Sequence, residues 1–263
     1  MANPILENGV GSPQSIYESF APGGLNGVNG GHHPVGTKAR IDERVFYYAS
    51  HSASNTLTLA LVYGNPAPNA NDQNRVWAGT AGSRIITVTC GAAVPANLYA
   101  GGYFLADSGT GAGQYFRIQS HTVADGSFII TATLFDPVVV TAAASPTGSL
   151  CKHPYVDNVV FPGTSQAAVV IGVPQVTVPG GNVNQQYYWT QTAGPAALSC
   201  EGAVTIGQGI VPATAATSDA GQGKAAVEFG TVAVQDMLPL IGHVLIANGT
   251  DEHHALVYLN IRE

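Results

Sequence analysis

The most distinctive string in this chain is Tyr187-Tyr188-Trp189-Thr190-Gln191-Thr192-Ala193-Gly194-Pro195. Successive side chains of a strand point to opposite faces, so Tyr187 and Trp189 share one face and Tyr188 takes the other. A core anchor beside a Gly-Pro turn, an exposed interface and a sugar-binding platform all use these residue types. We interpret the string as a core anchor on a strand over residues 186–191.

Outward from this string, the chain alternates short apolar segments with Gly- and Pro-rich turns. No segment of ten or more residues shows a helical period, so helix content should be very low. In residues 56–63 the side chains of Leu57, Leu59, Leu61 and Tyr63 fall on one face. The expected strands are residues 44–49, 56–63, 84–90, 103–106, 114–119, 128–134, 167–173, 175–178, 186–191, 203–206, 224–229, 242–247 and 255–261.

Two glycine-containing stretches predict hairpins. Asp125-Gly126 is a strong turn signal between residues 117–121 and 128–134, where Phe128, Ile130, Ala132 and Leu134 should share a face. The run Asp107-Ser-Gly-Thr-Gly-Ala-Gly113 superficially suggests a phosphate-binding loop. No lysine follows it and the next residues favour a strand, so we expect a turn.

The composition divides the chain into three parts. Residues 1–37 are rich in glycine and proline and have no periodicity, which predicts an extended arm. Its apolar side chains indicate that it docks on a partner, and a floppy terminus is the alternative. The candidate interaction residues are Ile5, Leu6, Ile16, Tyr17 and Phe20. A proline-studded connection from Ser145 to Gly163 predicts a boundary between β-domains at residues 38–160 and 161–263. The expected fold is all-β, with two small β-sandwich or β-barrel domains after the arm.

The charge content narrows the function classes. Charged residues make up 10% of the 263 residues, against about 25% in a typical soluble domain, and the net charge is −7. A nucleic-acid partner is not expected, because Lys and Arg are too few to neutralise phosphates. No signal peptide and no apolar run long enough to cross a membrane is apparent, so we expect no membrane partner.

No motif predicts catalysis, a cofactor or a metal centre. The cysteines Cys90, Cys151 and Cys200 are odd in number and far apart, which favours small buried hydrophobes. Two pairs of adjacent histidines occur, at residues 32–33 and 253–254. In a strand, the two side chains of each pair would point to opposite faces and could not bind one metal ion together, so we assign no metal site. The aspartates lie mostly at expected strand ends and turns. A triad assembled in space stays open at this point.

Several strings resemble tailed-bacteriophage virion proteins, over about residues 36–261. They are Gly36-Thr37 with Asp42-Glu43-Arg44-Val45-Phe46-Tyr47-Tyr48-Ala49, Gly113-Gln114-Tyr115-Phe116-Arg117-Ile118 leading through His121 to Thr133-Leu134-Phe135-Asp136-Pro137, and Tyr188 to Pro195. The stretches Ile206-Gly207-Gln208-Gly209-Ile210-Val211 and Pro239-Leu240-Ile241-Gly242-His243-Val244 are similar to the β-domains of phage head-decoration proteins.

This resemblance implies a non-enzymatic decoration, or cement, protein on the capsid surface of the virion, assembled in the host cytoplasm. Its partner would be the outer surface of the major capsid protein lattice, and a homo-oligomer, with a trimer favoured, would stabilise the head. The resemblance carries over no catalytic residues. Another virion component, such as a head fibre, head–tail or tail protein, stays open, as does, less strongly, an enzyme or carbohydrate-binding module.

Overall fold

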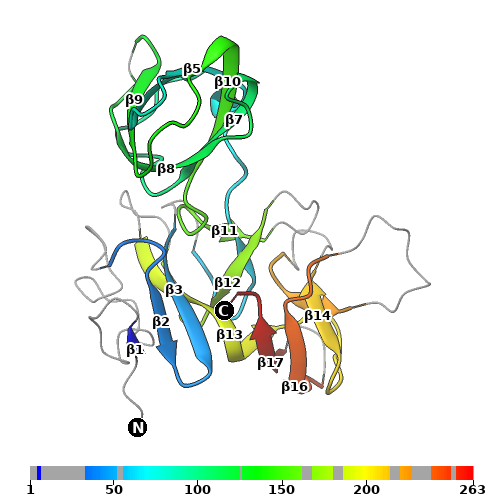
Figure 1. Ribbon diagram of the computed structural model, residues 1–263. Coiled ribbons are helices and arrows are strands. Elements are labelled where there is room, and N and C mark those ends of the chain that lie inside the picture. The colour runs from blue at the N-terminus through cyan, green and yellow to red at the C-terminus, as the bar shows by residue number, and fades with distance from the viewer. Residues whose placement is uncertain are drawn as a thin grey trace. The chain divides into compact units, whose positions relative to one another are not determined.

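In the computed structural model, nearly all of the regular secondary structure is β-strand (Figure 1). The structure describes residues 5–6, 33–51, 56–124, 126–161, 168–179, 186–213, 220–226, 238–249 and 253–262. Within these ranges the helical content is one 3-10 turn, η1 (Ala70–Asp72), and no helix there is long and apolar enough to cross a membrane. The expected all-β class with two small domains is confirmed.

The chain forms two compact units whose boundaries differ from the predicted ones. The sheet unit comprises residues 1–66 and 154–263, and the barrel unit comprises residues 67–153. The predicted boundary between residues 160 and 161 is wrong, because β3 (Arg44–His51) pairs with β13 (Gln186–Ser199) in one sheet. Pro146, which suggested a linker, lies inside a strand of the barrel. The barrel unit is therefore an insertion in the sequence of the sheet unit.

The barrel unit is a closed six-stranded antiparallel barrel in the order β10-β5-β6-β9-β8-β7. Its strands are β5 (Arg75–Gly79), β6 (Ile85–Thr89), β7 (Tyr103–Thr110), β8 (Tyr115–His121), β9 (Ile129–Leu134) and β10 (Ala143–Cys151). The barrel closes because β10 pairs with both β5 and β7. Alternate side chains point inward to one core, whose members include Trp77, Ile86, Val88, Phe104, Phe116, Ile118, Ile130, Leu134 and Leu150.

Both predicted hairpins of the barrel are present. β8 pairs antiparallel with β9, and β7 pairs antiparallel with β8 across the glycine-rich turn. Gly111 and Gly113 have positive φ in that turn, which glycine adopts at little cost. One detail of the prediction is wrong: Phe128 does not join the inward face of β9. It has a left-handed φ of 54° before the strand begins and is exposed.

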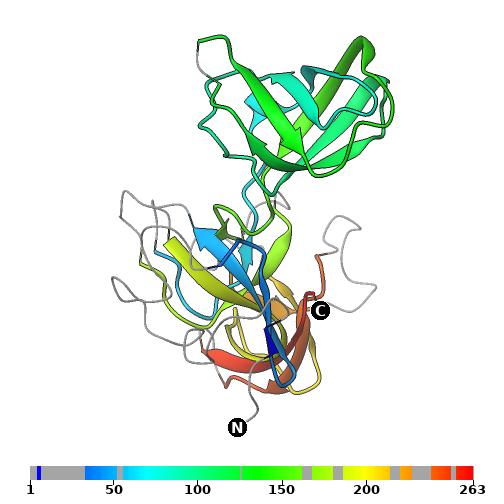
Figure 2. The ribbon, with the colours of Figure 1, turned by 60° about the vertical axis from the view of Figure 1, so that its left-hand side comes forward.

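The sheet unit follows the order β1-β2-β3-β13-β17-β16-β14-β15, with β4, β11 and β12 beside this path (Figure 2). The remaining strands are β1 (Ile5–Leu6), β2 (Lys38–Ile41), β4 (Tyr63–Gly64), β11 (Val159–Val160), β12 (Val170–Pro174), β14 (Gly209–Pro212), β15 (Gly223–Ala225), β16 (Gly242–Ile246) and β17 (His254–Asn260). Residues 203–206, predicted as a strand, contain no strand, because the chain turns at Ile206-Gly207.

The strand predicted over residues 56–63 is also wrong. Leu57 makes an isolated bridge to Val178, and the chain then turns at Leu59 and Ala60, where φ of Ala60 is 63°. Leu57 is consequently buried while Leu59 is exposed, although strict alternation would place them on one face. Only Tyr63 and Gly64 of this region form a regular strand, β4.

The aromatic string on β13 anchors two separate cores, as its alternation predicts. Tyr188 packs with Ala49, Tyr63 and other apolar side chains on one face. Trp189 packs on the other face with Phe46 and Tyr48, and its ring centroid lies 5.0 Å from that of Tyr48. The core interpretation is confirmed, and the buried Trp189 offers no exposed platform for a sugar.

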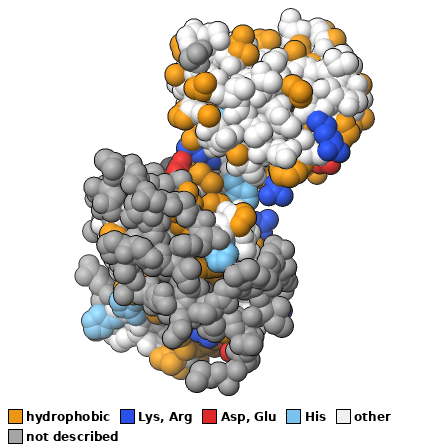
Figure 3. Space-filling model, turned by 90° about the vertical axis from the view of Figure 1, so that its left-hand side faces the viewer, with side chains coloured by type: hydrophobic (Ala, Val, Ile, Leu, Met, Phe, Trp, Pro, Cys, Tyr) orange, Lys and Arg blue, Asp and Glu red, His pale blue; other side chains and the backbone are white. Residues whose placement is uncertain are grey.

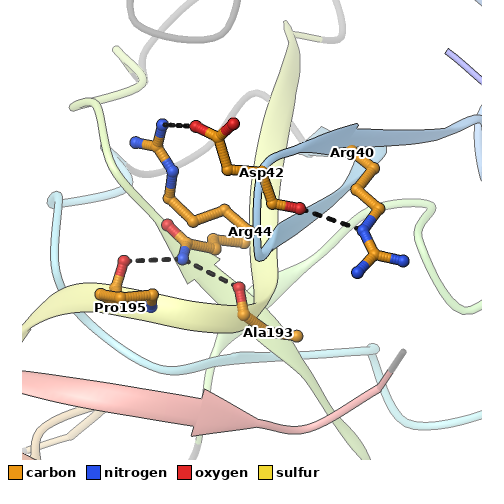
Figure 4. Close-up of polar contacts among 6 residues, drawn as sticks. Arg40, Asp42, Arg44, Ala193 and Pro195 are labelled. Carbon is orange, nitrogen blue, oxygen red and sulfur yellow. Dashed lines mark hydrogen bonds and ion pairs between the residues drawn. The ribbon is translucent and has the colours of Figure 1, made fainter. Parts of the chain in front are cut away.

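Gly194-Pro195 makes a bend inside β13 rather than the turn expected after residue 191. Gly194 has φ of 83°, and the strand continues beyond it to Ser199. The buried Gln191 side chain spans the bend by donating to the carbonyls of Ala193 at 3.0 Å and Pro195 at 2.9 Å (Figure 4). Before the bend β13 pairs with β3 and β12, and from Ala193 onward it pairs with β17.

The turn between β2 and β3 packs against this bend. Arg40 Nε donates to the Asp42 carbonyl at 3.0 Å, and Arg44 Nη2 lies 4.0 Å from Asp42 Oδ2 (Figure 4). A Cβ at Gly194 would lie 2.7 Å from the Glu43 carbonyl oxygen and 2.9 Å from Arg44 Cα. Both the left-handed φ and this close approach therefore require glycine at position 194.

Gly194→Ala should lower the free energy of unfolding of the sheet unit by about 3 kcal/mol, since it combines left-handed strain with a backbone clash. Urea denaturation followed by Trp189 fluorescence in a Trp77→Phe background measures this unit. Gly207→Ala is the matched control, because φ is also positive there (81°) but the space beside it is open. It should cost about 1 kcal/mol. Equal losses in the two variants would contradict the close-approach argument.

Candidate functional site

The interaction residues predicted in the N-terminal arm are only partly described. Ile5 and Leu6 form β1 and pair through their backbones with Arg40 and Ala39 at the edge of the sheet. Ile16, Tyr17 and Phe20 lie outside the described residues. The predicted arm ends too late, because His33 already contacts the rings of Tyr48 and Trp189, with centroids 5.4 Å from each.

The cysteines and histidines singled out in the sequence do not gather into one site. Cys90 and Cys200 are buried free thiols, as expected, and burial raises the pKa of Cys90 to about 12 and that of Cys200 to about 11. Cys151 is half-buried, and desolvation also raises its pKa. Within the described ranges, no three His, Cys, Asp or Glu side chains lie close enough to hold a metal ion.

A cluster of polar side chains lies inside the barrel unit and is buried from solvent. The Tyr99 hydroxyl donates to Asp72 Oδ2, and desolvation raises the pKa of Tyr99 well above its usual value, helped by Asp72. His121 Nε2 accepts from the Tyr99 backbone N–H at 2.9 Å, and its Nδ1 donates to the Thr122 carbonyl at 2.7 Å. The neutral imidazole satisfies both bonds, and burial lowers the pKa of His121. This cluster supports the fold, because it is closed to a substrate.

An exposed surface on the outside of β7 and β8 has the composition of a binding site. Tyr103 lies opposite Arg117, and Leu105 lies opposite Tyr115, in the antiparallel register of these strands. Their neighbours Phe104, Phe116 and Ile118 point into the barrel, so these four side chains point outward. Tyr115 is 73% exposed, which is unusual for so large a side chain.

Phe135 extends this surface beyond β8. Its N–H donates to the Arg117 carbonyl at 3.0 Å, and the Arg117 guanidinium lies 5.0 Å from the centroid of its ring. The cation–π contact holds the arginine beside the ring, and a guanidinium in such a contact can still donate hydrogen bonds from its N–H groups. We call the five residues Tyr103, Leu105, Tyr115, Arg117 and Phe135 the barrel patch.

Hydroxyl groups on β7 and β10 border the barrel patch. Ser149, opposite Leu105, donates to Asp107 Oδ2 at 2.6 Å, and the hydroxyls of Ser108 and Thr147 lie 2.7 Å apart. The Asp107 carboxylate already accepts a hydrogen bond from Ser149. Part of its hydrogen-bonding capacity is therefore satisfied within the barrel before a partner binds. Figure 3 shows the barrel unit with hydrophobic side chains spread over a surface that carries few charged groups.

Gln114, directly before Tyr115, fixes one end of the barrel. Its side-chain nitrogen donates to the carbonyls of Gly111 (2.9 Å) and Val140 (3.1 Å). Its Oε1 accepts from the N–H groups of Val139 (2.9 Å) and Val140 (2.8 Å). All four hydrogen bonds of the amide are made, so the loop carrying the exposed Val139 is held rigidly beside β8.

The barrel patch suits the binding of another protein. Tyr and Arg are enriched at the energetic centres of protein interfaces, and Phe is enriched in the interfaces as a whole. A rigid barrel also lowers the entropy lost on binding. Sequence analysis missed these residues, because Tyr103-Phe104-Leu105-Ala106 is apolar at inward and outward positions alike. The available signal was that Tyr103 and Leu105 give β7 large apolar side chains at the outward positions, where an antiparallel strand with one solvated face normally carries polar ones.

No known protein family, curated protein or solved structure matches this chain.

Gln114→Ala should lower the free energy of unfolding of the barrel unit by about 1–2 kcal/mol, because it removes four hydrogen bonds that water replaces only in part at this exposed loop. The amide hydrogens of Val139 and Val140 should then exchange with solvent faster, as measured by hydrogen exchange with mass spectrometry. Gln119→Ala, on an exposed position of β8, should change neither quantity. Unchanged protection of residues 139–140 would contradict the role assigned to Gln114.

His121 should make the barrel unit less stable as the pH falls below about 6.5. At higher pH, the imidazole is neutral in both the folded and the unfolded state. Below this pH, the imidazole of the unfolded state binds a proton, whereas burial disfavours the charged form in the folded state. Stability should therefore fall by up to about 1.4 kcal/mol per pH unit. Urea denaturation followed by Trp77 fluorescence in a Trp189→Phe background at several pH values measures the slope.

His121→Gln retains an acceptor for the Tyr99 N–H but cannot titrate, so it should flatten this slope. Gln119→Ala, on an exposed position of β8 in the same barrel, should leave the slope unchanged. An equal slope in the wild type and His121→Gln would show that His121 is not the group responsible.

Proposed function

We propose that this chain is a non-enzymatic structural protein of a tailed-bacteriophage virion, which decorates the outer surface of the major capsid protein lattice and stabilises the head. The observation that carries the binding role is the barrel patch, in which exposed aromatic side chains and an arginine lie on a rigid closed barrel. The phage partner comes from the resemblance of residues 36–261 to virion proteins.

The chemistry of the barrel patch favours a protein partner with a flat surface. Its two cross-strand pairs form a sheet face, to which Phe135 adds a third aromatic ring beside Arg117. An arginine lying on an aromatic ring can still donate to a backbone carbonyl or a carboxylate of the partner. Apolar contact and a few directed hydrogen bonds are the usual components of such an interface.

A lattice partner makes a small patch sufficient. One patch of five residues is smaller than a standard stable interface, which involves about 20–30 residues a side. An oligomer that presents several patches to a regular lattice binds much more tightly, because after the first contact the others form at a high effective concentration. The low charge of the chain fits this role, since few ionic groups must be stripped of water on contact.

The Tyr115→Ser and Arg117→Glu variants should each bind at least about tenfold more weakly to expanded capsids that lack the chain, because they remove exposed interface side chains. Co-sedimentation of the purified chain with these capsids measures the affinity, and circular dichroism checks the fold. Val76→Ser is the matched control, since Val76 is an exposed apolar residue on β5 of the same barrel and lies outside the barrel patch.

The copy number of the chain in purified virions tests its place there. Quantitative mass spectrometry should find it at an abundance comparable with that of the major capsid protein. A few copies per particle would indicate a connector, fibre or tail component instead. Its absence from virions would overturn the proposal.

A further inference from the structure

Arg117 is the one charged side chain of the barrel patch, and its neighbours there are aromatic. Tyr103 lies opposite it on β7, Tyr115 precedes it by two residues on the same face of β8, and the Phe135 ring centroid lies 5.0 Å from its guanidinium carbon. Side chains at opposite positions of paired strands are close enough to interact. Arg117 is itself exposed, so its charge can reach a partner.

The charge of Arg117 has no counterion within the part of the chain that the structure describes. No carboxylate there forms an ion pair with it. Asp136 directly follows Phe135 in the sequence, yet it is not paired with the arginine. Asp107, at the border of the patch, instead accepts a hydrogen bond from Ser149. The guanidinium is therefore placed to pair with an acceptor from outside these residues.

The hydroxyls of Tyr103 and Tyr115 add hydrogen-bond donors beside the arginine. Both side chains are exposed, and neither hydroxyl has a hydrogen-bond partner among the described residues. A guanidinium can donate two parallel hydrogen bonds to the two oxygens of a carboxylate, which offer about four lone-pair sites between them. A backbone carbonyl has a single oxygen and satisfies fewer of these donors. The set of donors therefore fits a carboxylate better than a carbonyl.

The distribution of charge between the two units is compatible with an acidic partner, although the chain as a whole is acidic. In the barrel unit, residues 67–153, basic and acidic side chains are equal in number. The basic ones are Arg75, Arg84, Arg117 and Lys152, and the acidic ones are Asp72, Asp107, Asp125 and Asp136. The net charge of −7 consequently belongs to the residues of the sheet unit. A barrel without net charge can bring Arg117 to an acidic surface without net repulsion, because salt at physiological concentration screens charges beyond about 8 Å.

We propose that Arg117 binds a carboxylate of the partner protein, an aspartate or glutamate side chain that apolar residues flank. This inference rests on the proposed function and specifies the chemistry that the capsid surface presents to the barrel patch. An exposed ion pair in water contributes little to affinity. On contact, the aromatic side chains around Arg117 exclude water from the pair, and charges interact more strongly where water is excluded. The apolar residues of the partner would at the same time cover Leu105 and Phe135.

Co-sedimentation of the full chain with expanded capsids that lack it, at about 50 mM and about 500 mM NaCl, tests this inference. The wild type should bind at least about tenfold more tightly than Arg117→Gln at low salt, because the variant leaves the partner's carboxylate unpaired. This advantage should shrink at least about threefold at high salt, which screens the ion pair. Arg117→Lys keeps the charge but lacks the planar fork, so its affinity should be intermediate and its advantage over Arg117→Gln should also shrink with salt. Circular dichroism checks the fold, and Arg117→Lys compared with the wild type keeps the test decisive if Arg117→Gln fails to fold.

Arg84→Gln is the matched control, because Arg84 is an exposed arginine of the same barrel that lies outside the barrel patch. It changes the net charge by the same amount and should bind like the wild type at both salt concentrations.

Three results would overturn the inference. If the advantage of the wild type over Arg117→Gln is the same at both salt concentrations, Arg117 contributes contact rather than charge, and the capsid proposal stands without the carboxylate. Equal losses in Arg84→Gln and Arg117→Gln would show a general effect of charge rather than a site at Arg117. A wild type that does not bind capsids at either salt concentration would overturn the proposed function and this inference with it.

Discussion

The sheet unit depends on one bent strand that joins its other strands. β13 pairs with β3 and β12 before Gly194 and with β17 from Ala193 onward. Strand alternation directs Tyr188 and Trp189 into two different cores, and the part of the strand after the bend places Leu198 in a third. Glycine reaches the left-handed conformation of this bend at little cost, and any Cβ there would meet the turn between β2 and β3. The buried amide of Gln191 satisfies two carbonyls at the bend, where regular strand pairing is interrupted.

This pairing also explains why the barrel unit can be inserted in the sequence. The chain between β3 and β13 has only to leave the sheet unit and return to it. The entropic cost of closing such a connection grows slowly with its length, so a long insertion adds little to that cost. The barrel has its own core around Trp77, Phe104 and Ile130, and it has no free sheet edge, because β10 pairs with both β5 and β7. The insertion therefore has its own source of stability.

Local alternation predicted much of the secondary structure but few of the pairings. The strands around Phe104, Ile130 and Trp189 followed from side-chain period, and the β7–β8 and β8–β9 hairpins followed from their turn residues. Gly194-Pro195 was predicted as a turn because glycine with positive φ occurs both in turns and in bends within a strand. The sequence nearby does not distinguish the two, whereas the packing of Gly194 against Glu43 and Arg44, which are distant in sequence, favours the bend. The barrel patch was missed for a related reason: the exposure of Tyr115 depends on barrel closure, which the local sequence does not encode.

The barrel patch explains how a chain with so few charges can be a component of an assembly. Exposed apolar side chains are unfavourable in water, and they favour association when a complementary surface is present. The barrel patch also contains an arginine and lies beside hydrogen-bonded hydroxyls, which suits a different protein better than a purely apolar contact would. Because these side chains lie on the strands of a closed barrel, they keep their positions before a partner binds, and less entropy is lost on binding.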